Sequence, residues 1–154
     1  MQKIHEAETI QLNLILCAAP FACKQLSYHF YGNYFMQTLL SVAWHARAVT
    51  PRIAAAATPE ILNCAGKTFG NILGALQGDF ADMALHPQAN YVLDTLLELS
   101  SEEEVAVVAE EMSSSFFQLV SHRWGHKLLV QAVNKMVRPP LLPDLASLLG
   151  LAAF

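Results

Sequence analysis

A twelve-residue segment that occurs three times constrains this chain more than any other feature. The copies are His29–Leu40, His86–Leu97 and His122–Val133. Each copy begins with His, and an apolar residue stands three places before that His. Four places after the His stands a polar residue, which is Asn33, Asn90 or His126. A self-similar segment in a fixed register predicts a repeat architecture, in which stacked units share one continuous core.

The spacing of the three copies is irregular. The second and third copies are 36 residues apart, whereas the first and second are 57 apart, which leaves 21 extra residues between them. Two interpretations account for segment 58–78. It is either a truncated repeat, with Phe69-Gly70-Asn71 as a degenerate fourth copy of the turn, or a single inserted helical segment.

Helical patterns alternate with turn signals along the chain, and no segment has a convincing strand pattern. We expect a single domain, residues 1–154, in which each unit is a short helix, a turn containing His, a middle helix and a third helix. The expected repeats are residues 20–57, 79–114 and 115–138, followed by a cap helix over 144–154. The chain is therefore predicted to be all-α.

Capping and breaking residues predict the helix ends. Asn33 is a plausible N-cap for a helix over 34–46, Thr50-Pro51 restarts the chain, and Ser101 with Glu104 forms a capping box. Glycine is costly inside a helix, so we expect a break near Gly66 or Gly70.

The bulk composition excludes several classes of protein. The chain has 154 residues, of which 54% are hydrophobic and 14% charged, so it is expected to fold as one apolar-rich domain. A net charge of −4 argues against a globally basic nucleic-acid binder but leaves room for a local basic patch. No apolar run is long enough for a membrane span, and no targeting segment is recognisable, so an intracellular protein is expected, with the alternative that the sequence is a piece of a longer chain.

The residues that carry chemistry in enzymes do not form a pattern here. Cys17, Cys23 and Cys64 are odd in number and contain no CxxC pair, which is typical of buried thiols in a reducing compartment. The histidines are scattered, so we expect no metal site. The sequence also lacks a nucleophile elbow, a phosphate-binding loop and a pair of acids in a catalytic arrangement. We therefore expect neither enzymatic activity nor a cofactor.

The turn and the start of the middle helix resemble a known family. Tyr31–Gln37 reads aromatic-Gly-Asn-Tyr-x-x-Gln, Gln88–Asp94 matches with two departures, and Trp124–Val130 keeps the framework only. This motif in a unit of about 36 residues resembles the Pumilio (PUF) repeat, over about residues 20–138. The irregular spacing and the Pro-Gln-Ala turn are most similar to the divergent nucleolar Pumilio-like proteins of ribosome assembly.

The resemblance implies an α-solenoid of about three three-helix repeats that binds single-stranded or structured RNA, one base per repeat, within a ribonucleoprotein particle such as a ribosome or its assembly intermediate. It implies a nuclear or nucleolar location, with the mitochondrion or cytoplasm as alternatives. Asn33 and Gln37 are then edge readers and Tyr34 the stacking residue. The corresponding RNA-binding candidates in the other copies are Asn90, Tyr91, Asp94, His126 and Lys127.

Each of these residues also has a structural interpretation. Both asparagines are plausible N-caps, both tyrosines plausible packing residues, and the three aligned histidines are expected to bond backbone groups in the turns. Glu102–Glu104 and Glu110-Glu111 are expected to form a solvated helix face. The basic residues Arg123, Lys127, Lys135 and Arg138 are either a phosphate contact or a plain surface.

The alternative function is a helical-repeat scaffold whose RNA code has decayed and which binds proteins only. The apolar end of the chain, residues 145–154, favours a buried contact, because a short repeat stack has open ends that need a cap or a protein partner.

Overall fold

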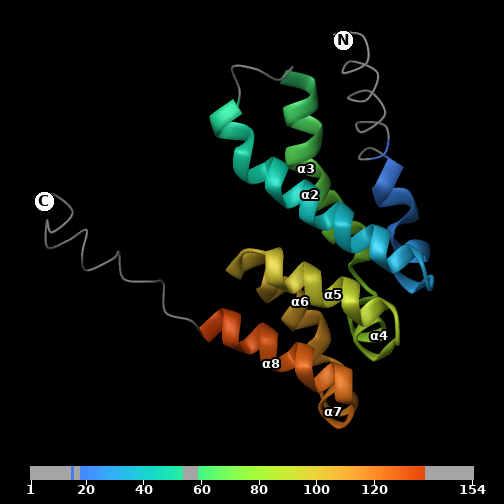
Figure 1. The fold of residues 1–154 in the computed structure, drawn as a ribbon. Coiled ribbons are helices and arrows are strands. Elements are labelled where there is room, and N and C mark those ends of the chain that lie inside the picture. Colours follow the sequence, from blue (N-terminus) through green and yellow to red (C-terminus); the bar gives the residue numbers. More distant parts are fainter. Residues whose placement is uncertain (1–14, 16–17, 54–58, 138–154) are drawn as a thin grey trace, which may run out of the picture.

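Helices joined by short turns make up the part of the chain that the structure, a computed structural model, describes, namely residues 15, 18–53 and 59–137 (Figure 1). A helix over residues 18–28 is followed by α2 (Gly32–Ile53), α3 (Pro59–Leu76), α4 (Phe80–Leu85), α5 (Ala89–Leu99), α6 (Glu102–Ser113), α7 (Phe116–Ser121) and α8 (Arg123–Val137). These residues include no strand, so the all-α prediction is confirmed. The expected cap helix over 144–154 lies outside the described residues.

A short helix, a turn and a long helix follow one another three times. The pairs are 18–28 with α2, α4 with α5, and α7 with α8. α2 packs against α5 and α5 packs against α8, and Figure 1 shows the three long helices running in the same direction, side by side. α6 contacts α4, α7 and α8, so it joins the second unit to the third.

The extra residues of the first unit lie mainly in longer helices. α2 has 22 residues against 11 in α5, and α3 has 18 against 12 in α6, which accounts for 17 of the 21 residues; longer connections supply the other four. α3 follows α2 along the chain as α6 follows α5. The truncated-repeat interpretation is wrong, because Phe69-Gly70-Asn71 lies inside uninterrupted α3 and forms no turn.

Two predicted interruptions do not occur. α3 runs through Gly66 and Gly70 without a break, since the glycine cost of about 1 kcal/mol each is offset by burial of Phe69, Ile72 and Leu76 from the same helix. α2 also continues through Thr50-Pro51 to Ile53. Pro51 lies two residues before the end of α2, where the backbone donor that it lacks affects only the last turn.

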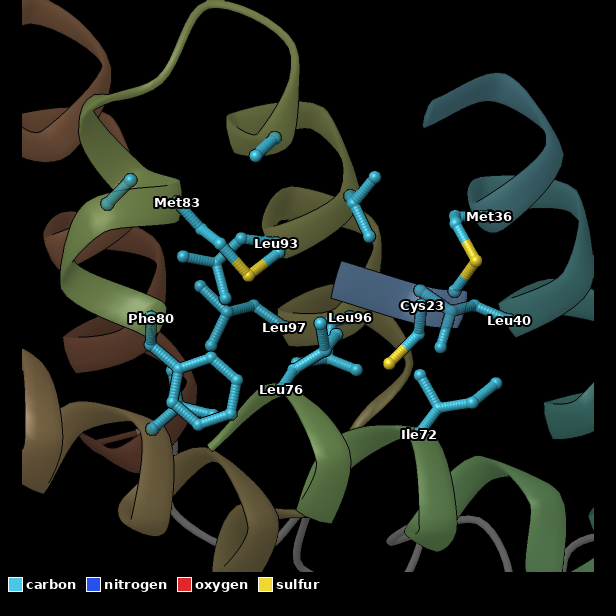
Figure 2. Close-up of a cluster of buried hydrophobic side chains, with 14 of the residues drawn as sticks. Cys23, Met36, Leu40, Ile72, Leu76, Phe80, Met83, Leu93, Leu96 and Leu97 are labelled. Atoms are coloured by element: carbon cyan, nitrogen blue, oxygen red, sulfur yellow. The ribbon is translucent and has the colours of Figure 1, made fainter. Parts of the chain in front are cut away.

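One apolar core spans the first two units (Figure 2). It combines side chains from the helix over 18–28, α2, α3, α4 and α5, among them Cys23, Met36, Leu40, Ile72, Leu76, Phe80, Met83, Leu93, Leu96 and Leu97. All ten side chains are fully buried. The same cluster continues into α6, α7 and α8 through Val108, Leu119 and Leu128. Burial is therefore shared between units, as the repeat pattern predicts.

Two glutamates of α6 hold helix N-termini in place. The capping box is confirmed: the backbone N–H of Glu104 donates to Ser101 Oγ (3.3 Å), and that of Ser101 donates to Glu104 Oε2 (2.8 Å). Glu111 acts over a longer range, because its carboxylate accepts from the backbone N–H groups of Gly78 (2.7 Å) and Phe80 (2.8 Å) at the start of α4. A solvated face was expected for Glu111; instead its negative charge caps another helix.

We expect Glu111→Ala to lower the free energy of unfolding by about 1–2 kcal/mol, because the first turn of α4 would lose two acceptors. Urea denaturation followed by circular dichroism measures this change. Glu110→Ala is the control, since it removes an equal charge from an exposed neighbour on the same helix, and it should change stability by less than about 0.5 kcal/mol. Equal effects of the two substitutions would contradict the capping role.

Glycine is required where the long helix begins close to the short one. An ideal Cβ at Gly32 would lie 2.6 Å from the carbonyl oxygen of Leu26, and one at Gly125 would lie 2.8 Å from that of Leu119. Both distances are shorter than a carbon can approach a backbone oxygen, so the helices would have to separate. The second unit carries buried Ala89 at this position, so its turn leaves room for one methyl group.

Gly32→Ala is expected to destabilise the fold by about 1–3 kcal/mol, because the added methyl group overlaps backbone. The same change at Gly74 should stabilise it by about 0.5–1 kcal/mol, since Gly74 is exposed within α3 and no heavy atom of its described surroundings lies within 4 Å of a Cβ there. Thermal and urea unfolding of the two variants test the opposite signs. A stabilising Gly32→Ala would refute the close-approach argument.

Candidate nucleic-acid interface

The aligned histidines start the long helices of the first two units. His29 Nδ1 accepts hydrogen bonds from the backbone N–H groups of Tyr31 (3.3 Å) and Gly32 (3.1 Å). His86 Nδ1 does the same with Gln88 and Ala89, both at 3.2 Å. These bonds satisfy backbone donors at the start of α2 and α5, as expected for histidines in structural turns. Each imidazole must therefore carry its proton on Nε2.

The third turn differs from the other two. α8 begins at Arg123, directly after His122, whereas α2 and α5 begin three residues after their histidines. His122 Nδ1 is buried and has no hydrogen-bond partner among the described residues, and its ring instead packs edge-on against Trp124 with 5.1 Å between ring centroids. His122 therefore occupies the same position in its unit as His29 and His86, but it does not make their hydrogen bonds to the start of the long helix.

The two asparagines brace the turns from inside the helices. Both are buried, and because α2 starts at Gly32 and α5 at Ala89, the prediction that they are N-caps is wrong. Asn33 Nδ2 donates to the carbonyls of His29 (3.2 Å) and Phe30 (2.6 Å), and Asn90 Nδ2 donates to the carbonyl of His86 (2.6 Å). The backbone N–H groups of the same asparagines also donate to the carbonyls of His29 (3.1 Å) and His86 (3.2 Å), so each asparagine bonds its turn through both its backbone and its side chain.

Gln37 belongs to the same network. Its Nε2 donates to Asn33 Oδ1 at 3.0 Å, and the side chain is only partly exposed. The two amides expected to read a base edge therefore lie together on one face of α2, as their spacing predicts. In this structure they bond each other and the turn.

The tyrosines that follow the asparagines face solvent. Tyr34 is 64% exposed on α2 and Tyr91 is 52% exposed on α5, at equivalent positions of adjacent long helices. Lys127 occupies the same position on α8 and is also exposed. The long helices thus present a row of Tyr, Tyr and Lys, one per unit. Neither tyrosine belongs to the buried core.

Residues expected to meet RNA on the second and third units bond each other. Lys127 Nζ lies 2.5 Å from Asp94 Oδ2, which links α8 to α5. The Gln131 amide of α8 also donates to the backbone carbonyl of Asp94, at 3.2 Å. The ion pair is surface-exposed, so it contributes at most about 1 kcal/mol. His126, the remaining candidate, is exposed at the start of α8.

Lys135 caps the end of a neighbouring helix. Its Nζ donates to the carbonyls of Leu97 (2.8 Å) and Glu98 (2.6 Å), where the last carbonyls of α5 lack partners within the helix. A cation at a helix C-terminus is favourable. Burial lowers the pKa of Lys135, with nearby Glu98 and Glu104 acting in the opposite direction. No local sequence pattern predicts this contact, because the bonded residues are 37 and 38 positions apart.

The expected basic cluster is largely engaged within the protein. Lys127 and Lys135 bond α5, and the Arg123 guanidinium lies 4.4 Å from the centre of the Trp124 ring. Arg138 lies outside the described residues. Between α5 and α8 runs an open groove of about 640 Å³, lined by Asp94, Glu98, Lys127, Val130, Gln131, Asn134 and Lys135. Lys127 therefore belongs both to the groove and to the row of exposed side chains on the long helices.

Other kinds of site find no support in the described part of the chain. It contains no group of three His, Cys, Asp or Glu side chains that could hold a metal ion. None of its helices is both long and apolar enough to cross a bilayer. Cys23 is buried, and burial raises the pKa of its thiol, as expected for a core cysteine.

Comparison with known proteins identifies no relative. No family model matches the chain, and no curated protein and no solved structure is significantly similar to it. Function therefore has to be argued from the residues on the face formed by α2, α5 and α8.

Asn33→Ala is expected to lower the free energy of unfolding by about 1–3 kcal/mol, because the Phe30 carbonyl loses its side-chain donor and the His29 carbonyl keeps only the backbone N–H of residue 33. Thr38→Ala is the control on the same helix: its exposed hydroxyl donates to the carbonyl of Tyr34, and the change should stay below about 0.5 kcal/mol. Guanidinium denaturation compares the two. An Asn33→Ala protein as stable as Thr38→Ala would show that the bracing bonds are dispensable.

Proposed function

We propose that this chain is an RNA-binding module of Pumilio-like type, built as an α-solenoid of three-helix repeats and acting in a ribonucleoprotein particle such as a ribosome or its assembly intermediate. The observation that carries the proposal is the pair of exposed tyrosines, Tyr34 and Tyr91, at equivalent positions of adjacent long helices. The proposal implies a nuclear, and more narrowly nucleolar, location.

Stacking on an exposed aromatic ring requires no particular base, because every base has a π-face. Such a stack contributes about 1–3 kcal/mol per base. Packed helices lie about 8–10 Å apart, well beyond the spacing of stacked bases, so Tyr34 and Tyr91 would hold two bases that are splayed from each other. One base per repeat is also the mode implied by the resemblance to Pumilio repeats.

Base selectivity is expected to be low. Both asparagine amides are bonded to their turns, Gln37 is bonded to Asn33, and Asp94 is bonded to Lys127. Reading a base edge would require some of these bonds to break, which offsets the energy gained. We therefore propose that stacking, rather than edge reading, supplies most of the RNA affinity.

Weak salt dependence is part of the same proposal. The net charge is −4, and Lys127 and Lys135 of α8 are both engaged with α5. Few phosphates would be neutralised on binding, so affinity should fall less steeply with salt than for a basic RNA-binding protein.

The second candidate is a scaffold that binds proteins only. The bonds that Asp94, Lys127 and Lys135 make within the protein favour it, because they occupy groups that would otherwise contact RNA. The two candidates differ in one measurable property, affinity for single-stranded RNA at low salt.

Fluorescence anisotropy with a labelled uridine-rich octanucleotide at low salt tests the proposal. Tyr34→Ala and Tyr91→Ala should each weaken binding by about 5- to 150-fold, the equivalent of one lost stack. Phe117→Ala is the matched control, since it removes an exposed aromatic side chain from α7, and its affinity should equal that of the wild type.

Two outcomes would reject RNA binding by this face. One is the absence of any binding at low salt, which favours the protein-only scaffold. The other is binding that neither tyrosine substitution weakens. Both variants replace exposed side chains, so thermal unfolding should confirm that they remain folded.

A further inference from the structure

Four equivalent positions of the short and long helices differ in burial between the units. The four positions lie six and two residues before each histidine and seven and eleven residues after it. In the first two units all of them are fully buried, as Cys23, Ser27, Met36 and Leu40 and as Phe80, Ala84, Leu93 and Leu97. In the third unit Phe116 is 50%, Val120 44% and Val133 53% exposed, and Leu129 is partly buried.

Contact with the next unit explains the burial in the second unit. α4 packs against α7 and α8, and α5 packs against α8. No described element follows α8 to cover the third unit in the same way. Its four side chains instead line an open, mostly apolar groove of about 360 Å³, together with Val130 and the polar residues His126 and Asn134. We call this surface the tail face.

The opposite end of the series has a matching surface. Phe35 of α2 is 45% exposed, whereas the equivalent Val92 of α5 and Leu128 of α8 are buried. Val42 of α2 is likewise exposed, whereas the equivalent Leu99 and Lys135 are partly buried. These positions lie on the long helix that begins the α2–α5–α8 series. We call the surface of Phe35 and Val42 the head face.

We propose that the tail face of one molecule binds the head face of a second copy of this chain. The contact continues an interface that the protein already contains twice, between α2 and α5 and between α5 and α8. Among the described residues, no helix covers the tail face as α7 and α8 cover its equivalents in the second unit, and no long helix precedes α2 as α2 precedes α5. One chain therefore carries both halves of the same repeating interface.

The chemistry of the two faces is compatible with this contact. The side chains that define them are apolar, and the polar members of the groove, His126 and Asn134, carry no obligatory charge. Burying them together requires no ion to lose its water, so the apolar area removed from solvent drives association. The interface is head to tail, and each dimer keeps one free face at either end.

Sedimentation velocity over a wide concentration range tests the proposal with the full chain. The average mass should rise with concentration for the wild type. Val133→Asp on the tail face and Phe35→Asp on the head face should each weaken self-association at least about tenfold, because each places a charge in the contact. Phe117→Asp is the control: it puts the same charge on an exposed aromatic of α7 outside the groove, and should associate like the wild type.

Mixing the two interface variants gives the decisive result. Val133→Asp keeps an intact head face and Phe35→Asp an intact tail face, so an equimolar mixture should form a one-to-one dimer and nothing larger. Should either variant unfold by circular dichroism, Val120→Lys and Val42→Lys replace it at the same faces.

The proposal is overturned by a wild type that stays monomeric at every concentration, by a mixture that forms no dimer, or by association that the interface variants leave unchanged. A tail face covered by another part of this chain or reserved for a different protein would give the first result. None of these outcomes depends on whether the protein binds RNA.

Discussion

The close contact between each short helix and the long helix that follows it is the constraint on which the rest of the structure depends. Gly32 and Gly125 allow the backbones to approach, and the histidine and asparagine side chains bond the turn between them in the first two units. These contacts fix the angle at which α2 and α5 leave their turns. Because the long helices leave in the same direction, they stack side by side and share one core.

The same constraint limits what the polar residues can do for a ligand. The side-chain amides of Asn33 and Asn90 donate to carbonyls of their own turns, so in this structure they are engaged within the protein and are not available to a base edge. Asp94, Lys127 and Lys135 hold α8 on α5. The tyrosines on the long helices and several apolar residues at the two ends of the series stay exposed. The proposed RNA face and the proposed self-association face follow from this division.

Local sequence patterns predict a helix end correctly where the residues that form the end are close together in the chain. The Ser101–Glu104 capping box correctly places the start of α6 at Glu102. The predictions were wrong at Gly66, Gly70 and Thr50-Pro51, where a residue unfavourable in helices was read as a break. Those penalties are each about 1–3 kcal/mol, and the burial of side chains such as Phe69 and Leu76 is comparable, so the sequence alone could not decide the outcome.

The sequence by itself determined the all-helical class, the three-fold register and the structural role of His29 and His86, because each depends on residues within a few positions of one another. Only the tertiary structure decided which amides are buried, that Glu111 caps α4, that Lys135 caps α5, and that the four core positions are open in the third unit alone. These features join residues about 30 to 40 positions apart or depend on the neighbouring unit. Such contacts form only when the helices pack, and no spacing along the chain encodes them.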